Sequence, residues 1–122
     1  MRELTCIIVD DHSFAITLLK AYLTQFSELK LLDTFTDPVL ARTYINEHKG
    51  IDILFTDVEM PKISGIELVE SISTKVNHVV FVTSRFRHEL RPKMVGKWHY
   101  LFKPSRLEEF REVFLEIQSE YK

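Results

Sequence analysis

Short runs of apolar residues recur along the chain at fairly regular intervals, and they predict five strands. Runs such as Cys6–Val9 and Val79–Val82 are apolar at every position rather than at every second one. That pattern is typical of strands covered on both faces, as in a parallel sheet. The predicted strands are Thr5–Val9, Lys30–Phe35, Ile51–Thr56, His78–Thr83 and Tyr100–Phe102.

The segments between these strands carry apolar residues at helical spacing. In the first, Phe14, Leu18, Tyr22 and Phe26 are predicted to form one face. Similar stripes lie within 40–45, 66–72 and 107–121. The segment between Thr83 and Tyr100 gives the weakest helical pattern. Pro92 falls inside it and lacks a backbone donor, so we expect a short, late-starting or kinked helix there.

Strands that alternate with helices predict βαβ units with right-handed crossovers. The expected fold class is α/β: a doubly wound, five-stranded parallel sheet in the flavodoxin-like order 2-1-3-4-5, with helices on both faces. A chain of 122 residues has the length of one domain, so residues 1–122 are predicted to form a single unit.

Composition excludes several classes of function. Sixteen basic against eighteen acidic residues give a net charge of −2, which argues against nucleic-acid binding by this domain itself. No apolar run approaches the length of a membrane span, and no signal peptide is visible, so we expect a cytoplasmic protein without membrane contact. The lone Cys6 cannot form an intrachain disulfide and is expected to pack as a small hydrophobic residue.

Polar side chains with complementary chemistry follow four of the predicted strands. Ligands in open α/β sheets bind beyond the carboxyl ends of the strands. Neighbouring strands lie about 4.8 Å apart, so acids at their ends converge and repel one another unless a cation lies among them. Few oxygen ligands with open positions suit Mg²⁺. The residues at these ends are Asp10, Asp11, Asp57, Thr83, Ser84 and Lys103.

A pocket of this kind combines a nucleophile with an anion site. Asp57 could attack phosphorus to give an aspartyl phosphate, while Lys103 and Thr83 hold the phosphoryl oxygens. Alone, Asp11 could simply cap a helix, and Lys103 could be an ordinary solvated lysine. Their joint occurrence at the correct strand ends favours the chemical interpretation. The five histidines show no metal-ligand spacing, and His12 is expected at the rim of the site.

At this point the chain resembles the receiver domain of two-component response regulators over its whole length. Cys6–Asp11 is similar to the family's first strand and acidic pair. Residues 57–68, DVEMPKISGIEL, are similar to its phosphoacceptor segment. Thr83-Ser84 resembles the switch hydroxyl and its small neighbour, and Tyr100–Pro104 resembles the fifth-strand signature. These motifs also resemble those of receivers that precede LytTR-type DNA-binding domains.

The resemblance implies that Asp57 accepts a phosphoryl group from a histidine kinase or phosphotransfer protein. Asp11 and Asp57 would bind Mg²⁺ directly, Asp10 would bind it through water, and the main-chain carbonyl of Glu59 would add a ligand.

The resemblance also implies a switch and an output surface. Thr83, Ser84 and Tyr100 would form the switch, and the Lys103–Pro104 bond would be cis. The output face, which could also form a homodimer, would comprise the fourth helix, fifth strand and fifth helix.

Several positions depart from the family pattern. Ser84 is larger than the usual alanine, Pro92 interrupts the fourth helix, and Trp98 stands in an altered stretch where it is either core or an exposed partner anchor. The basic segment from Arg85 to Lys97 is either a solvated face or a patch for an acidic partner. We also hypothesise that Glu59 and Arg85 pair across the pocket and slow water attack on the phosphoryl group.

Three other functions compete with a phosphoacceptor domain. A degenerate receiver would bind proteins without using phosphate. A flavodoxin-type cofactor protein would need a phosphate loop after the first strand, where Asp10 and Asp11 would repel an anion. A phosphatase with an aspartyl intermediate would need D-x-D there, but His12 occupies the third position. A 122-residue chain has no room for an output domain, so it is a stand-alone receiver or part of a longer protein.

Overall fold

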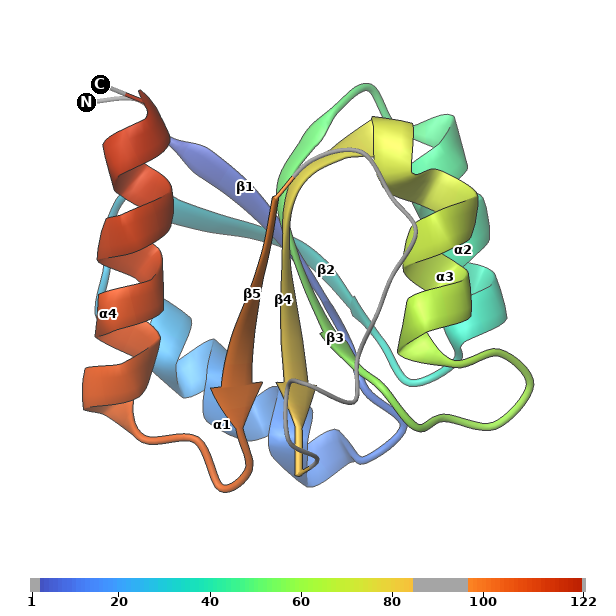
Figure 1. The fold of residues 1–122 in the computed structure, drawn as a ribbon, viewed down its shortest axis with the longest axis horizontal. Coiled ribbons are helices and arrows are strands. Elements are labelled where there is room, and N and C mark those ends of the chain that lie inside the picture. Colours follow the sequence, from blue (N-terminus) through green and yellow to red (C-terminus); the bar gives the residue numbers. More distant parts are fainter. Residues whose placement is uncertain (1–2, 85–96, 122) are drawn as a thin grey trace.

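The computed structural model describes residues 3–84 and 97–121, and its centre is a parallel sheet of five strands in the order β2-β1-β3-β4-β5 (Figure 1). This confirms the predicted fold class. The strands are β1 (Leu4–Val9), β2 (Leu29–Phe35), β3 (Ile51–Asp57), β4 (Val76–Thr83) and β5 (Lys97–Phe102).

Helices cover both faces of the sheet, with α1 and α4 on one side and α2 and α3 on the other (Figure 1). The fourth helix predicted between Thr83 and Tyr100, with Pro92 in it, lies outside the described residues, so α4 is the helix that the sequence analysis counted as fifth. The helices are α1 (Ser13–Leu23), α2 (Pro38–Glu47), α3 (Gly65–Ile72) and α4 (Leu107–Gln118), with short 3₁₀ turns at Ser73–Lys75 (η1) and Ser119–Tyr121 (η3).

Alternation of side chains along the central strands builds two cores. In β1, Cys6 and Ile8 pack toward α1 and α4, whereas Ile7 and Val9 pack toward α2 and α3. All four are fully buried, which confirms the expected packing of Cys6, and burial raises the pKa of its thiol. The central strands need continuous apolar runs because their side chains point alternately into the two cores, one on each face of the sheet.

The prediction for α1 was partly wrong. Its buried residues are Ile16, Leu19 and Leu23, whereas Phe14, placed on the buried face by spacing alone, is 80% exposed. Tyr22 is only partly buried, although it does pack against the core on this side of the sheet. The predicted face followed the aromatic residues of this segment and therefore left out Ile16 and Leu19, which are buried.

Strand β5 begins at Lys97, three residues earlier than the predicted Tyr100. Trp98 and His99 pair with Val79 and Val80 of β4, although their composition gave no strand signal. Because β5 is the edge strand, its two faces differ: His99 is buried, and Trp98 is 38% exposed. The exposure argues against the core interpretation of Trp98.

Polar residues at the amino ends of the strands form a partly buried network, here called the amino-end cluster. At its centre, Oδ2 of Asp52 accepts from the N–H and hydroxyl of Thr5, at 2.9 and 3.2 Å. Oδ1 of Asp52 accepts from the Asn77 amide and the Tyr121 hydroxyl, both at 3.2 Å. The remaining members are His78, His99 and Glu116: Nε2 of His99 lies 3.4 Å from Nδ1 of His78, and Nδ1 of His99 lies 2.8 Å from Oε1 of Glu116.

Candidate functional site

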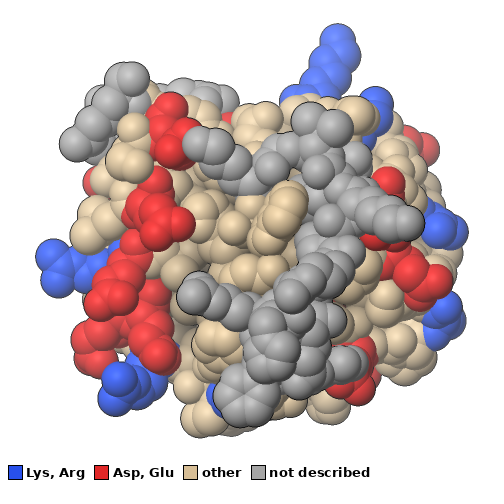
Figure 2. Space-filling model, viewed as in Figure 1, with Lys and Arg blue, Asp and Glu red and all other residues tan. Residues whose placement is uncertain are grey.

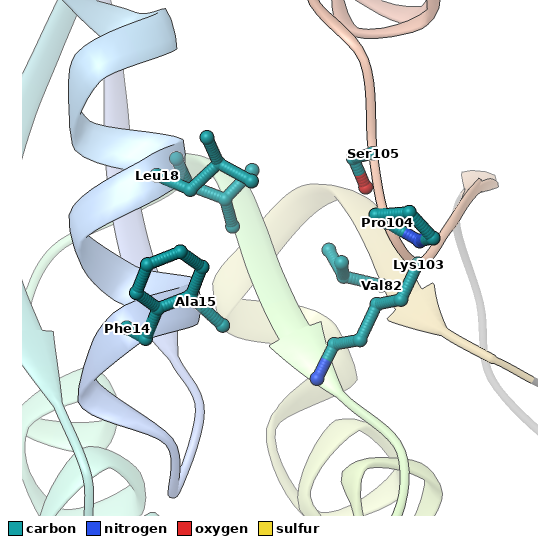
Figure 3. A pocket seen from close by; sticks show the side chains of 8 residues that line it. Phe14, Ala15, Leu18, Val82, Lys103, Pro104 and Ser105 are labelled. Atoms are coloured by element: carbon teal, nitrogen blue, oxygen red, sulfur yellow. The ribbon is translucent and has the colours of Figure 1, made fainter.

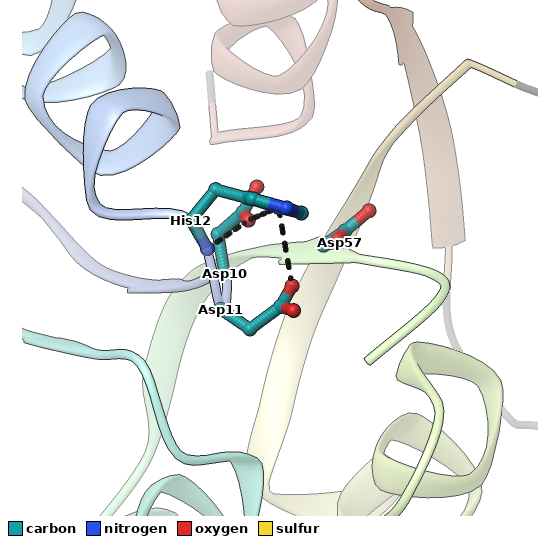
Figure 4. A group of neighbouring side chains, drawn as sticks. All are labelled: Asp10, Asp11, His12 and Asp57. Carbon is teal, nitrogen blue, oxygen red and sulfur yellow. Dashed lines mark hydrogen bonds and ion pairs between the residues drawn. The ribbon is translucent and has the colours of Figure 1, made fainter. Parts of the chain in front are cut away.

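The acids predicted at the carboxyl ends of the strands do converge. Asp10 directly follows β1 and Asp57 ends β3, and these strands pair through Val9 and Thr56. Asp10 is 1% exposed and Asp57 is 6% exposed. One donor atom from each of Asp10, Asp11, His12 and Asp57 lies within 4.8 Å of the others (Figure 4). Carboxylates this close together repel one another unless a positive charge lies nearby.

Lys103 supplies that charge from the end of β5. Its backbone N–H donates to the carbonyl of Thr83 at 2.9 Å, which fixes the residue beside β4. Its Nζ lies 3.0 Å from Oδ2 of Asp10 and 3.5 Å from Oδ1 of Asp57. The Lys103–Pro104 peptide bond is cis, as expected. We refer below to Asp10, Asp11, Asp57 and Lys103 together as the acidic site.

Electrostatics in the acidic site distinguish Asp57 from an ordinary aspartate. Burial, followed by the charge of Asp10, raises the pKa of Asp57 from 3.8 to about 6, while Lys103 opposes the rise. For Lys103, burial alone would lower the pKa, but the hydrogen bonds and charges of Asp10 and Asp57 raise it overall. At neutral pH the site therefore holds an ionised, poorly solvated carboxylate beside an ammonium group.

The loop after Asp57 is held by local sequence features. Gly65 donates its N–H to the carbonyl of Val58 at 2.7 Å, and a Cβ at Gly65 would collide with the carbonyl of Asp57. Glycine is therefore required where α3 starts against the site. Ser64 and Glu67 form reciprocal side-chain to backbone bonds, a capping box that begins α3.

A second lysine–aspartate pair fixes the outer part of this loop. Nζ of Lys62 lies 2.7 Å from Oδ2 of Asp37, and Asp37 also accepts from the N–H of Val39 as the N-cap of α2. The hydrogen bond from Lys62 lowers the pKa of Asp37. Lys62 itself takes a left-handed backbone conformation with φ of 74°. The pair joins two loops outside the acidic site.

A cavity of about 260 Å³ opens above Asp57, and most of the predicted site residues line it. Thr83 is buried at its wall and Ser84 is exposed beside it. Arg85 lies outside the described residues, so its suggested pairing with Glu59 remains a prediction. Tyr100 lies apart from this cavity, half-buried with its ring 5.9 Å from that of Phe81. The lining residues are His12, Asp57, Glu59, Thr83, Ser84 and Lys103.

His12 also lies close to the acids, which the spacing of the histidines did not predict. Placed at the rim as expected, it brings Nδ1 to 3.5 Å from Oδ1 of Asp10 and 3.4 Å from Oδ1 of Asp11. Conventional spacing rules for histidine ligands missed it because its partners are adjacent acids and an acid from another strand. The available signal was its position directly after the acidic pair.

A second, apolar pocket adjoins the acidic site across Lys103 (Figure 3). It measures about 290 Å³, and the side chains of α1 and the segment after β5 face each other across it. Phe14 stands at its edge and is largely exposed. Its lining residues are Phe14, Ala15, Leu18, Leu19, Val82, Lys103, Pro104 and Ser105.

The surface of α4 is acidic. Figure 2 shows red side chains gathered along this helix, whose sequence includes Glu108, Glu109, Glu112 and Glu116. Such a face would repel the phosphate backbone of a nucleic acid. Within residues 3–84 and 97–121, no helix is both long and apolar enough to cross a membrane.

Comparison with known proteins agrees with this architecture. The family model of the response regulator receiver domain matches residues 6–115. An uncharacterized response regulatory protein of Vibrio parahaemolyticus is 30% identical over 102 residues, which cover 83% of this chain and 42% of that protein. The transcriptional regulatory protein YpdB of Escherichia coli is 26% identical over 100 residues, 80% of this chain and 41% of YpdB. This chain thus spans less than half the length of these relatives.

Solved structures show the same fold. The response regulatory domain of mrkE from Klebsiella pneumoniae superposes with a TM-score of 0.81 at 20% identity, covering 97% of this chain and 98% of that one. The chain belongs to the response regulator receiver domain family. It is therefore a signalling domain of the kind used in two-component systems, in which receivers interact with kinases or phosphotransfer proteins and generally bind Mg²⁺.

Proposed function

We propose that this receiver accepts a phosphoryl group on Asp57 from a histidine kinase or phosphotransfer protein. The observation that carries the proposal is the position of Asp57: a buried carboxylate with Lys103 at 3.5 Å and an open cavity above it. In the transfer, an Asp57 oxygen forms a bond to phosphorus as the bond from phosphorus to the donor imidazole nitrogen breaks. The electron pair of that bond leaves with the imidazole.

The residues around Asp57 fit the developing charge. Lys103 already contacts the carboxylate and can move to a phosphoryl oxygen, where a charge-assisted hydrogen bond is strong. Thr83 lines the same cavity and brings a hydroxyl donor from the end of β4. The protein contributes position and charge compensation rather than covalent chemistry.

The same residues fit a divalent cation. Oδ1 of Asp11 is buried and accepts no hydrogen bond from the described residues, which suits an oxygen that can bind a cation. Oδ2 of Asp10 is already paired with the Lys103 ammonium group at 3.0 Å. Asp11 and Asp57 would hold Mg²⁺ directly, Asp10 would hold it through water, and the main-chain carbonyl of Glu59 would complete the protein ligands. Bound Mg²⁺ would neutralise the acids and the incoming phosphoryl oxygens.

Phosphorylation would then be read by a switch. New negative charge at Asp57 would draw the hydroxyl of Thr83, with Ser84 following, and would favour a more buried position for Tyr100. The output face would include β5 and α4, together with the helix expected before β5, and could form a homodimer. The cytoplasmic location expected from the sequence is part of this proposal.

The apolar pocket beside Lys103 gives the phosphodonor a place to dock. It shares Lys103 with the acidic site, and Phe14 at its edge is largely exposed. A partner surface packed there would lie next to Lys103 and the acidic site. In this arrangement the apolar pocket would bind the partner, and the charged residues of the acidic site would carry out the phosphoryl transfer.

Intact mass measurement tests the proposal. The chain is incubated with Mg²⁺ and phosphoramidate or acetyl phosphate, in parallel with Asp57→Asn and with a sample containing a chelator. We expect the mass of one phosphoryl group on the parent chain only. A chain that gains no mass in Mg²⁺ would instead be the degenerate receiver, a binding module that does not use phosphate.

The suggested contact between Glu59 and Arg85 has its own test within this function. Phosphoryl half-lives of Glu59→Asn and Arg85→Ala should both be shorter than that of the parent chain. Unchanged half-lives in both would discard the modulator role.

A further inference from the structure

The side chain of His12 contacts the acids of the acidic site rather than the helix that follows it. It is the residue before α1, in an extended conformation, and its side chain makes no capping hydrogen bond to that helix. Its backbone N–H donates to Oδ1 of Asp10 at 2.9 Å, which holds the residue close to the acids. The ring is turned back toward the carboxylates rather than toward α1 (Figure 4).

The position of the ring nitrogen is suitable for a metal ligand. Nδ1 of His12 lies 3.4 Å from Oδ1 of Asp11, and both atoms belong to the group whose members are within 4.8 Å of one another. Two neighbouring ligands of one octahedral ion stand about 3 Å apart, because each lies about 2.1 Å from the metal at a right angle. A small adjustment would let His12 and Asp11 bind one ion together.

The contacts of Lys103 do not occupy the carboxylate oxygens that His12 approaches. Lys103 approaches Asp10 through the other carboxylate oxygen, Oδ2, whereas His12 approaches through Oδ1. The His12 side chain is 70% exposed, so its ring can settle on an ion without breaking core packing. Buried Oδ1 of Asp11, which accepts no hydrogen bond within residues 3–84 and 97–121, faces the same ring nitrogen.

We propose that Nδ1 of His12 is a direct ligand of the divalent cation, and that it shifts the preference of this site from Mg²⁺ toward ions that accept nitrogen, such as Co²⁺ and Ni²⁺. Carboxylate, carbonyl and water ligands suit Mg²⁺, whereas imidazole suits the later first-row ions. The inference rests on the proposed metal site, and it makes His12 the residue that sets the selectivity of that site.

Calorimetric titrations with Co²⁺ and with Mg²⁺ test the proposal without any phosphoryl chemistry. His12→Ala should weaken Co²⁺ binding at least about tenfold, since loss of even an outer partner of a metal ligand costs about 10- to 100-fold in affinity. Mg²⁺ binding should change far less. The visible absorption of bound Co²⁺ should also shift when the nitrogen ligand is lost.

Two control variants locate the effect. His48→Ala removes an imidazole that stacks on Tyr44 at the end of α2, away from the acidic site, and should leave both affinities unchanged. Asp11→Asn should abolish the binding of both ions. Equal losses of Co²⁺ and Mg²⁺ affinity in His12→Ala, or an unshifted Co²⁺ spectrum, would overturn the role of His12 alone. Failure of the parent chain to bind either ion would overturn the proposed metal site itself.

Discussion

Strand β3 carries a buried aspartate near each end, and the two have opposite surroundings. Asp52, at the amino end, is 4% exposed and accepts four hydrogen bonds from neutral donors in the described part of the chain. Asp57, at the carboxyl end, accepts one from the N–H of Val58 at 2.8 Å and otherwise faces Lys103, Asp10 and an open cavity. Burial alone therefore does not mark a reactive carboxylate.

The partners of each carboxylate account for the difference. Neutral donors on β1, β4 and η3 bind the carboxylate of Asp52, so this residue links β1 and β4 to η3. Asp57 lines a cavity and lies beside another acid, so its buried charge costs stability. Asp52 therefore stabilises the fold, whereas Asp57, the proposed phosphoryl acceptor, destabilises it.

The largest effect should come from removing the charge that balances Asp57. Lys103→Met should slow phosphoryl uptake about 100-fold or more, the size seen when one preorganised donor to a developing charge is lost. The uptake rate from phosphoramidate measures it. Lys62→Met is the matched control, because it breaks a lysine–aspartate pair outside the acidic site. Equal rates for the two variants would contradict the assigned role of Lys103.

The same substitution at the two aspartates should change stability with opposite sign. Asp52→Asn replaces an acceptor oxygen by an amide that faces donors, and should destabilise the fold by about 2 kcal/mol. Asp57→Asn removes a desolvated charge and should stabilise it by up to about 2 kcal/mol at pH 8, allowing for solvent screening. Urea unfolding of both variants measures this. Destabilisation by both would remove the contrast.

The gain in Asp57→Asn should depend on pH. The folded-state pKa of Asp57 is about 6 and the ordinary value is 3.8. The folded parent chain therefore binds more protons than the unfolded chain between these values, and its stability falls as pH rises through this window. The stability difference between Asp57→Asn and the parent should be near zero below pH 3.8 and should level off above about 6. A difference that stayed constant across this range would show that burial does not raise the pKa.

The smallest effect should come from the edge of the amino-end cluster. Glu116→Ala removes the carboxylate that accepts from His99, and its side chain is 71% exposed. We expect a loss of about 1 kcal/mol in unfolding free energy and no change in phosphoryl uptake. A slower uptake in this variant would show that the two ends of the sheet are coupled.

Sequence alone predicted the sheet order and most of the acidic site, for a physical reason. Strands buried on both faces leave continuous apolar runs, and the residue after each run must lie at the carboxyl edge. The sequence alone therefore predicts that Asp10, Asp57 and Lys103 lie together. Gly65 stood in the recognised motif, although its steric role appeared only when α3 was placed against Asp57.

The amino-end cluster could not be predicted in the same way. Asp52 and His78 stand inside strand patterns as isolated polar residues, and His99 precedes the predicted start of the fifth strand. Their partners come from β1, β5 and η3. Nothing in local spacing distinguishes a satisfied buried acid from an unsatisfied one. The early start of β5 was missed for a related reason, since cross-strand pairing and not composition extends it over Trp98.

The most direct test of the account is to locate the phosphoryl group chemically. After incubation with a phosphodonor and Mg²⁺, borohydride reduction converts an aspartyl phosphate to homoserine, and peptide mass spectrometry reads its position. The account predicts homoserine at position 57 alone, with positions 10, 11 and 52 unmodified. Homoserine at any of those three positions, or at none, would contradict the assignment of Asp57 as the acceptor.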